Sequence, residues 1–438
     1  MFMGGPSRCG RRFPPAPGDR QERGTPARRA SATPFGHCAA RNCGGNWAEM
    51  RRRLALALPF LAAPALAQQQ AAEWRVGALF PLSGAAALVG DEAARGLELA
   101  VEERNAAGGR AIRLIRADVT EPAQALAEAR RLIQQERAGL LFGSVSAPIG
   151  LAAIQAAESL ETPFVELAAA ADNLTERGAR HLVRTAPRAA DYGILGAEAL
   201  TRFLPGHLGR PAEALRVALL HENGGTSESI ALALDARLRE AGVMVAERLP
   251  HGARTSEMAA MVHRLRAASV NVLIHAANEG DAISLFRALA EANWRPAAVI
   301  GAGLAWGLAD LARAVGPALD SAFALDVPPI ETADRVAHGA RPFAEVYQRR
   351  WGTPPRSGLS LAAYAGAQLV LSQPNLERGP LRAGLVAMDL AEGSLPNGWG
   401  FRIDERGQNT RARPVLLQWQ AGKPVAVFPA EMAAAAPV

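Results

Sequence analysis

Cysteine and lysine are scarce in this chain of 438 residues. The three cysteines are Cys9, Cys38 and Cys43, so no disulfide can form within the rest of the sequence. A body free of cysteine suits an oxidising compartment, although it does not prove one. The single lysine, Lys423, leaves no phosphate-binding loop of the GxxxxGK[ST] type.

Long apolar runs are also missing, since no segment after residue 67 has the eighteen uncharged apolar residues expected of a membrane helix. The apolar run Leu54–Leu66 is 13 residues long, follows the basic stretch Met50–Arg53 and ends in the small-x-small triplet Ala65–Ala67. This pattern predicts a signal peptide over residues 50–67 and a soluble mature protein in the periplasm. No cysteine follows the cleavage point, so we predict no lipid anchor.

Residues 1–49 are rich in Arg, Pro and Gly and have no hydrophobic period. They form either a disordered extension or a segment that is not translated. We favour translation from Met50, because a signal peptide that begins 49 residues into the chain would be masked.

The net positive charge of the chain lies in residues 1–67, which comprise the N-terminal segment and the predicted signal peptide. The whole sequence has 48 basic residues (Lys and Arg) and 42 acidic ones, with a pI of about 10.0. Residues 1–67 hold eleven of the basic residues and three of the acidic ones, which leaves 37 and 39 in the mature part. A mature chain near neutrality gives no support to nucleic-acid binding.

Catalytic and metal-binding motifs are missing as well. Gly301–Gly307 has the spacing GxGxxxG rather than that of a dinucleotide loop, and it lies late in the chain. Gly143–Ala147 is not a GxSxG elbow, and the histidines show no HxxxH or HExxH spacing. We therefore predict a protein that is not an enzyme and that has no metal or other cofactor.

Short apolar runs alternate with helical patterns along the mature chain, which is typical of parallel α/β sheets. Its roughly 370 residues suggest two domains. The expected strands are 76–80, 112–117, 140–142, 164–167, 216–220, 243–248, 271–274, 298–300, 322–327, 401–403 and 415–419. The expected helices are 91–105 with Asp91 as N-cap, 122–137, 148–159, 227–241, 255–268, 281–292, 308–314, 342–351 and 360–371.

Several segments resemble the leucine/isoleucine/valine-binding type of solute-binding protein of bacterial ABC importers. They are FPLSGAAALVGDEAARGLELAVEERNAAGG at 80–109, the turn at 143–147, AAAADNLTERG at 168–178, RTAP at 184–187, GTSESI at 225–230, NWRPAAVIG at 293–301 and FRIDERGQNTRARPVLLQWQAGKPVAVFP at 401–429. They cover nearly all of the mature chain in the expected order.

The resemblance implies a type I periplasmic-binding-protein fold, with two Rossmann-like lobes joined by three hinge crossings near Arg188, Ala322 and Arg413. Lobe 1 would comprise 68–187 and 323–412, lobe 2 would comprise 188–322 and 413–430, and 431–438 would be a tail. The expected partners are a small ligand, an amino acid or related carboxylate, and a permease in the inner membrane. We expect a monomer.

The first expected ligand contacts follow two neighbouring strands of lobe 1. Ser146 and Ala147 open a helix, where backbone N–H groups favour a carboxylate, although Ser146 could equally serve only as an N-cap. The resemblance places backbone contacts to the ligand at Ala168 and Ala170. Ala170 replaces the threonine of the family, which removes one side-chain hydrogen bond.

Further contacts are expected from lobe 2. Gly224 replaces an aromatic residue of many relatives, which implies a more open pocket, or marks only a glycine turn. The resemblance places the partner of a ligand ammonium at Asp281, with Glu279 as its neighbour, yet Asp281 could instead be an N-cap. Val89, with Leu88 beside it, and Trp306 would line an apolar pocket. Trp306 could alternatively pack within the hinge.

Three hypotheses follow. The first is a transporter's binding protein for a branched-chain or other apolar amino acid. The second keeps the fold but changes the ligand to an amide, a urea-like compound or an aromatic acid. The third is a periplasmic ligand sensor, or an enzyme on the same scaffold.

Overall fold

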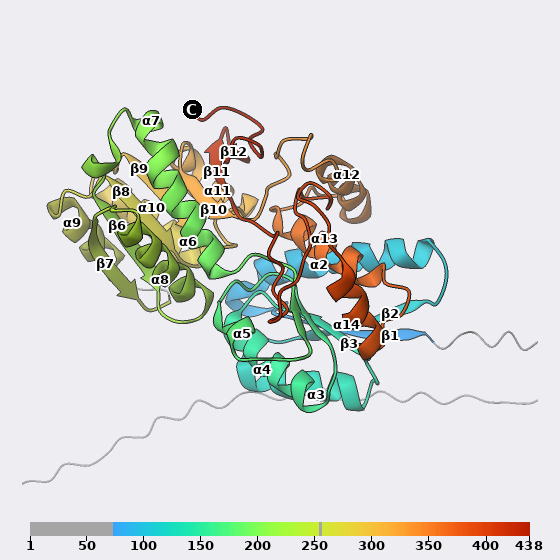
Figure 1. The fold of residues 1–438 in the computed structure, drawn as a ribbon. Helices are drawn as coiled ribbons and strands as arrows, with labels where there is room; N and C mark the ends of the chain where they lie inside the picture. Colours follow the sequence, from blue (N-terminus) through green and yellow to red (C-terminus); the bar gives the residue numbers. More distant parts are fainter. Residues whose placement is uncertain (1–72, 254–255) are drawn as a thin grey trace, which may run out of the picture. The chain divides into compact units, whose positions relative to one another are not determined.

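The computed structural model describes residues 73–253 and 256–438. The predicted signal peptide and the segment before it lie outside the described residues, so both stay predictions. The described residues fall within one compact unit, which contains two sheets. The α/β class predicted from the sequence is confirmed (Figure 1).

The N-terminal half builds a five-stranded sheet in the order β2-β1-β3-β4-β5, and every pair in it is parallel. Its strands are β1 (Trp74–Phe80), β2 (Ile112–Asp118), β3 (Leu140–Gly143), β4 (Phe164–Glu166) and β5 (Leu182–Arg184). The helices that accompany it are η1 (Gly84–Ala86), α2 (Ala87–Ala106), α3 (Pro122–Gln134), α4 (Ala147–Ser159), α5 (Asn173–Glu176), α12 (Ala340–Trp351), α13 (Leu359–Leu371) and α14 (Arg378–Ala387). We call this sheet and its helices the first lobe.

The second lobe contains a seven-stranded sheet in the order β12-β11-β10-β9-β8-β6-β7. Its strands are β6 (Val217–Glu222), β7 (Val245–His251), β8 (Val272–Ala276), β9 (Ala298–Ala302), β10 (Phe323–Asp326), β11 (Val415–Gln420) and β12 (Lys423–Phe428). The helices are α6 (Ala189–Glu198), η2 (Ala199–Phe203, a π-helical turn), α7 (Leu204–Leu208), η3 (Ala212–Ala214), α8 (Gly225–Glu240), α9 (Met258–Ala267), α10 (Glu279–Glu291), α11 (Ala309–Val315) and η4 (Gly316–Leu319). Five strands are parallel, and β11 and β12 add an antiparallel hairpin.

Each sheet carries an apolar core on both faces. In the first lobe, α2 and α13 cover one face, and α3 and α4 cover the other. The backbones of α2 and α13 approach so closely that a Cβ at Gly96 would lie 2.1 Å from the carbonyl oxygen of Ser360. In the second lobe, α6 and α8 cover one face, and α9 and α10 cover the other (Figure 1). Both sheets are therefore buried on two sides, which explains the short, wholly apolar strands.

The chain passes between the two sheets three times. It leaves the first sheet after Arg184, returns after Asp326 and enters the second sheet again at Val415. The crossing expected near Ala322 lies slightly later, after Asp326, because β10 pairs with β9 and β11 and therefore belongs to the second sheet. The return to the first lobe follows β10, at Val327.

The start of α2 also differs from the prediction. The helix begins at Ala87, one turn before Asp91, so Asp91 is not its N-cap. Asp91 lies within the helix and pairs with Arg95 at 2.9 Å. The early start is possible because residue 90 is glycine: a Cβ there would lie 1.8 Å from the carbonyl oxygen of Pro81.

Several elements were not predicted between β4 and β6, namely β5 and the helices α5, α6 and α7, and further differences lie in the C-terminal part. Phe401–Ile403 is not a strand, since Phe401 and Ile403 form only isolated bridges, to Leu390 and Asn409. β12 and α14 were not predicted. β12 carries Pro424, which an edge strand tolerates. α14 holds Gly379, Pro380 and Gly384, which normally break a helical pattern.

Candidate functional site

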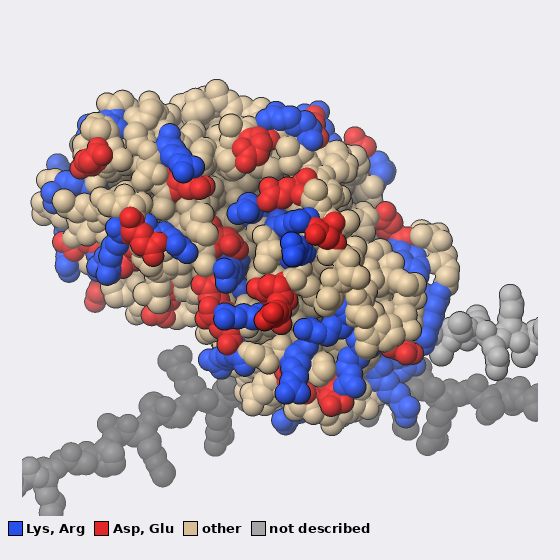
Figure 2. All heavy atoms as spheres, viewed as in Figure 1, with Lys and Arg blue, Asp and Glu red and all other residues tan. Residues whose placement is uncertain are grey.

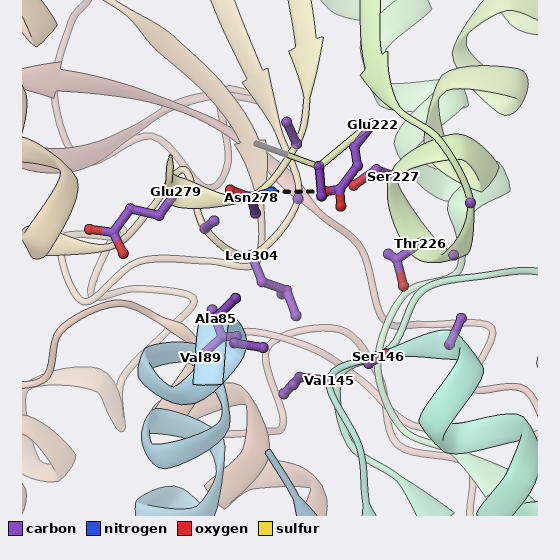
Figure 3. Close-up of a pocket in the computed structure, with 18 of the residues that line it drawn as sticks. Ala85, Val89, Val145, Ser146, Glu222, Thr226, Ser227, Asn278, Glu279 and Leu304 are labelled. Atoms are coloured by element: carbon purple, nitrogen blue, oxygen red, sulfur yellow. Dashed lines mark hydrogen bonds between the residues drawn. The ribbon is translucent and has the colours of Figure 1, made fainter. Parts of the chain in front are cut away.

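A cavity of about 410 Å³ lies where loops from both sheets meet (Figure 3). The first lobe contributes the start of α2 and the β3–α4 loop. The second lobe contributes the loops that follow β6, β8 and β9, together with Ala253. All the strands among these elements end at the cavity, as expected for a ligand site at the carboxyl edge of parallel sheets.

The β3–α4 loop brings a helix N-terminus to the cavity wall. Ser146 is the N-cap of α4, in an extended conformation, and its side chain makes no capping hydrogen bond. Ser146 and Ala147 both line the cavity. The first N–H groups of a helix have no partner within the helix, so this end offers donors to an anion. Ser146 is thus the N-cap by position, but its hydroxyl does not cap the helix, and its contact with a ligand stays a prediction.

The β6–α8 loop presents a second helix N-terminus. Gly224 and Gly225 have φ angles of 84° and 61°, which favour glycine, and both line the cavity. The N–H of Gly224 donates to the Glu228 carboxylate at 3.0 Å. Thr226 also lines the cavity, and its buried hydroxyl has no hydrogen-bond partner among the described residues.

Apolar side chains form another part of the wall. Leu88 and Val89 come from the first turn of α2, where Gly90 lets the helix start against Pro81. Leu304 and Leu308 come from the segment between β9 and α11. Figure 3 shows Val89, Leu304 and Val145 together, away from Glu222 and Ser227. The cavity therefore has a polar end and an apolar end.

Two carboxylates, Glu222 and Glu279, also line the cavity. Glu222 ends β6 and accepts a hydrogen bond from Asn278 Nδ2 through its Oε2, at 3.1 Å (Figure 3). Burial raises the pKa of Glu279, and the nearby Asp310 carboxylate raises it further. Figure 3 shows the Glu279 side chain directed away from Glu222.

Ala168 and Ala170 do not line this cavity, although the expected position beside the β3–α4 loop is correct. One backbone group of each residue is used within the chain: the N–H of Ala168 donates to Glu166 at 3.0 Å, and the carbonyl of Ala170 accepts the N–H of Ala189 at 2.6 Å. Glu166 is fully buried, and burial raises its pKa to about 7.

Asp281 and Trp306 also lie outside the cavity lining. The N-cap of α10 is Asn278, which accepts the N–H of Asp281 at 3.0 Å and donates back to its carboxylate at 2.8 Å, so Asp281 is not the cap. Trp306 is fully buried beside His275 and Phe286. Its packing is therefore in the core of the second lobe rather than in the hinge.

Residues that the sequence analysis did not select include Glu222, Thr226, Asn278 and Leu304. Glu222 ends a strand of the second lobe and the other three follow such strands, so the rule that places ligands at the carboxyl ends of parallel strands could have found them. What the sequence did not reveal is which side chain of each loop turns toward the cavity.

Metal chemistry finds no support in residues 73–253 and 256–438, where no group of three or more His, Cys, Asp or Glu is arranged to hold an ion. His251 and His275 approach through their Nε2 atoms at 3.1 Å, and burial holds the pKa of His275 well below its usual value. Among the described helices, none has the length and apolar character to cross a bilayer. On the face shown in Figure 2, acidic and basic side chains are interspersed.

Comparison with known proteins gives a consistent result. Residues 73–423 match the family model described as periplasmic binding protein. The chain is 35% identical over 382 residues to Leu/Ile/Val-binding protein homolog 7 of Brucella abortus (strain 2308), a match that covers 85% of this chain and 96% of the relative. Homolog 8 of the same strain is 32% identical over 372 residues, covering 83% and 92%.

Solved structures share the fold at lower identity. The branched-chain amino acid transporter substrate-binding protein LivJ of Streptococcus pneumoniae, in complex with isoleucine, has a TM-score of 0.71 at 18% identity, covering 82% of this chain and all of that one. A solute-binding protein of an ABC transporter from R. palustris, in complex with benzoate, has a TM-score of 0.68 at 21% identity, covering 84% and 97%.

Proposed function

This chain belongs to the periplasmic binding protein family, and on that premise we propose that it captures an apolar amino acid, branched-chain or related, for an ABC importer. The observation that carries the proposal is the cavity of about 410 Å³, whose walls come from both sheets. Its volume falls in the range of small-molecule sites. The predicted signal peptide would direct the protein to the periplasm. We expect the protein to act there as a monomer.

The two-sided wall supports a mechanism based on closure. A ligand that touches both lobes only when they are closed stabilises the closed form and shifts the population toward it. The closed, loaded protein would then dock on the permease of the inner membrane and release its ligand there. No step in this sequence requires catalysis.

The polar and apolar ends of the cavity fit an amino acid in one orientation. Its carboxylate would lie at the N-terminus of α4, near Ser146 and Ala147, and its side chain would pack on Val89 and Leu304. Each buried CH₂ group contributes about 0.8 kcal/mol. We assign the ammonium group to Glu222 in place of Asp281, because Glu222 lines the cavity and Asp281 does not. Such a charge-assisted hydrogen bond is stronger than a neutral one.

An aromatic carboxylic acid is the second candidate. It needs the same carboxylate site and apolar wall but no partner for an ammonium group. It is favoured by the cavity lining, which includes neither Ala168 nor Ala170, the two positions expected to bind an amino acid in the first lobe. Benzoate in the R. palustris protein shows that this fold accepts such an acid.

Thermal unfolding of the mature protein with leucine, 4-methylpentanoate, leucinamide and benzoate separates the candidates. A ligand at about 100 times its Kd should stabilise the protein by about 2.7 kcal/mol. Leucine should raise Tm most, since 4-methylpentanoate lacks the ammonium group and leucinamide lacks the carboxylate. A shift with benzoate but not with leucine would establish the second candidate, and no shift with any acid would refute the proposal.

Glu222→Gln tests the ammonium assignment. The variant should weaken leucine binding tenfold or more, because a bond to a charged group is worth about 1.5–3 kcal/mol. Binding of 4-methylpentanoate should be unchanged or stronger. The exposed Glu121→Gln is the control. Uptake of labelled ligand by cells with and without the gene would distinguish transport from sensing.

A further inference from the structure

Two helix N-termini, one from each lobe, meet at the polar end of the cavity. α4 begins at Ala147 and α8 begins at Gly225, and the first residues of both line the cavity. They are in near contact, because a Cβ built at Gly225 would lie 3.5 Å from Cδ of Pro148. A second contact lies one turn along α8, where the N–H of Asp172 donates to Ser229 Oγ at 3.2 Å.

The α8 terminus leaves hydrogen-bond donors available to a ligand. Neither N-cap residue, Ser146 nor Gly224, makes a side-chain capping bond, and at α8 only the N–H of Gly224 is taken, by the Glu228 carboxylate. Thr226 lines the cavity, and its buried hydroxyl has no partner among the described residues. Figure 3 shows Thr226 and Ser146 on the same side of the cavity, at the starts of these two helices. A buried hydroxyl without a partner is costly unless a ligand supplies one.

The electrostatics of this arrangement favour an anion. Each helix N-terminus carries the equivalent of roughly half a positive charge, which Glu228 in the first turn offsets in part at α8, whereas α4 has no acidic residue there. The positive charge that remains on the two ends is repulsive when nothing lies between them. A carboxylate placed between them would accept hydrogen bonds from both and turn repulsion between the lobes into attraction.

We propose that the ligand's carboxylate is bound by both lobes at once, by the start of α4 and by the start of α8, with the Thr226 hydroxyl as a donor from the second lobe. This inference rests on the proposed function for the ligand itself. It adds that the carboxylate is the group that holds the lobes together. An amide analogue would reach the cavity but would not favour closure to the same extent.

Thr226→Val removes the hydroxyl at nearly constant volume. Calorimetric titration with leucine, or with benzoate if that is the ligand, should show a Kd about 10- to 100-fold higher, since a hydrogen bond to a charged group is lost. Affinity for leucinamide or benzamide should change little, and Thr226→Ser should restore the affinity for the acid. Thr201→Val, whose hydroxyl donates to Ala197 outside the cavity, is the control. Equal acid affinity in wild type and Thr226→Val would overturn the proposal, yet the proposed function would stand.

Thr226→Asp places a carboxylate of the chain itself between the two helices. The variant should lose binding of the acid and should be as compact in small-angle scattering without ligand as the wild type is with it. Ala123→Asp introduces the same charge at the exposed second position of α3 and should change neither property. If wild type binds no carboxylic acid, the proposed function fails, and the scattering of Thr226→Asp still decides this inference: a radius equal to that of unliganded wild type would overturn it.

Discussion

The loops Ala168–Ala171 and Gly224–Ser227 occupy comparable positions in the two lobes, since each follows a parallel strand. They differ in how far their polar groups are hydrogen-bonded within the chain. In the first loop, Glu166 accepts the N–H groups of Ala168 and Ala169 at 3.0 and 2.9 Å. Arg184 donates to the carbonyls of Ala169 and Ala171 at 3.2 and 2.6 Å. In the second loop, the Thr226 hydroxyl has no partner among the described residues.

This difference shows that a position after a parallel strand does not by itself make a ligand contact. The same strand–loop topology can be closed by buried charges of its own chain, as at Glu166 and Arg184, or left open to the solute. The open donors lie at Ser146 and Thr226, at the edge of the cavity. Specificity should therefore depend on them more than on Ala168 or Ala170.

Arg184→Met should produce the largest loss of stability. The fully buried guanidinium also donates to Gln408 Oε1 and Thr175 Oγ1 at 2.5 and 3.1 Å, so its removal leaves several buried acceptors unpaired. We expect the free energy of unfolding to fall by about 4 kcal/mol in urea titration. The exposed Arg402→Met should change it by less than about 0.5 kcal/mol. Equal effects of the two variants would show that the first loop is not held by Arg184.

Glu166→Gln should change how stability depends on pH. The pKa of Glu166 is raised by burial to about 7, above its usual value of 4.5, so the folded state binds the proton more tightly than the unfolded state does. Its contribution to stability is complete below about pH 4.5 and is lost as pH rises to 7. At 1.4 kcal/mol for each pKa unit, that loss is up to about 3 kcal/mol.

In the Glu166→Gln variant, the free energy of unfolding should not show this fall between pH 4.5 and 7. Urea unfolding between pH 4 and 8 would measure it. Glutamine keeps the oxygen that accepts the N–H groups of Ser144, Ala168 and Ala169, so the loop should keep its conformation. Glu121→Gln, at an exposed position, serves as control. Parallel pH profiles for Glu166→Gln and wild type would contradict the prediction.

Asp91→Ala should have the smallest effect. A lost N-cap costs about 1 kcal/mol, whereas a half-exposed ion pair between residues i and i+4 of a helix is worth about 0.3–0.5 kcal/mol. Because Asp91 lies inside α2 and pairs with Arg95, we expect the smaller value in thermal unfolding. A loss of 1 kcal/mol or more would indicate that Asp91 caps the helix after all.

Most of the fold could be predicted because its parallel strands and amphipathic helices leave strong periodic patterns, as at Val76–Phe80 and Pro122–Gln134. The helix start at Ala87 could not, since it depends on Gly90, which permits a close approach to the backbone of Pro81. Helix α14 could not either, because its glycines and proline are poor helix formers. The assignment of β10 depended on its long-range pairing with β11.

Of the predicted site residues, some line the cavity and others do not. Ser146, Ala147, Gly224 and Val89 follow from the rule that ligands lie after parallel strands, and all four line the cavity. Asp281 lies in the first turn of α10 and Trp306 in the loop after β9, but both are buried in the second lobe. The hydrogen bond from Asn278 holds Asp281 there, and the aromatic packing holds Trp306. The direction of a side chain within a loop is a property of the tertiary structure.

The segment around Gln408 and Asn409 has a consequence for how the lobes can move. Gln408 Nε2 donates to the carbonyl of Ala186 at 2.9 Å, and Asn409 Nδ2 donates to that of Thr185 at 3.1 Å. These two hydrogen bonds link the first and third connections between the sheets side by side at one point. Sliding or twisting one lobe against the other would have to break these buried bonds. We expect a swing of the lobes about this point to leave these bonds intact.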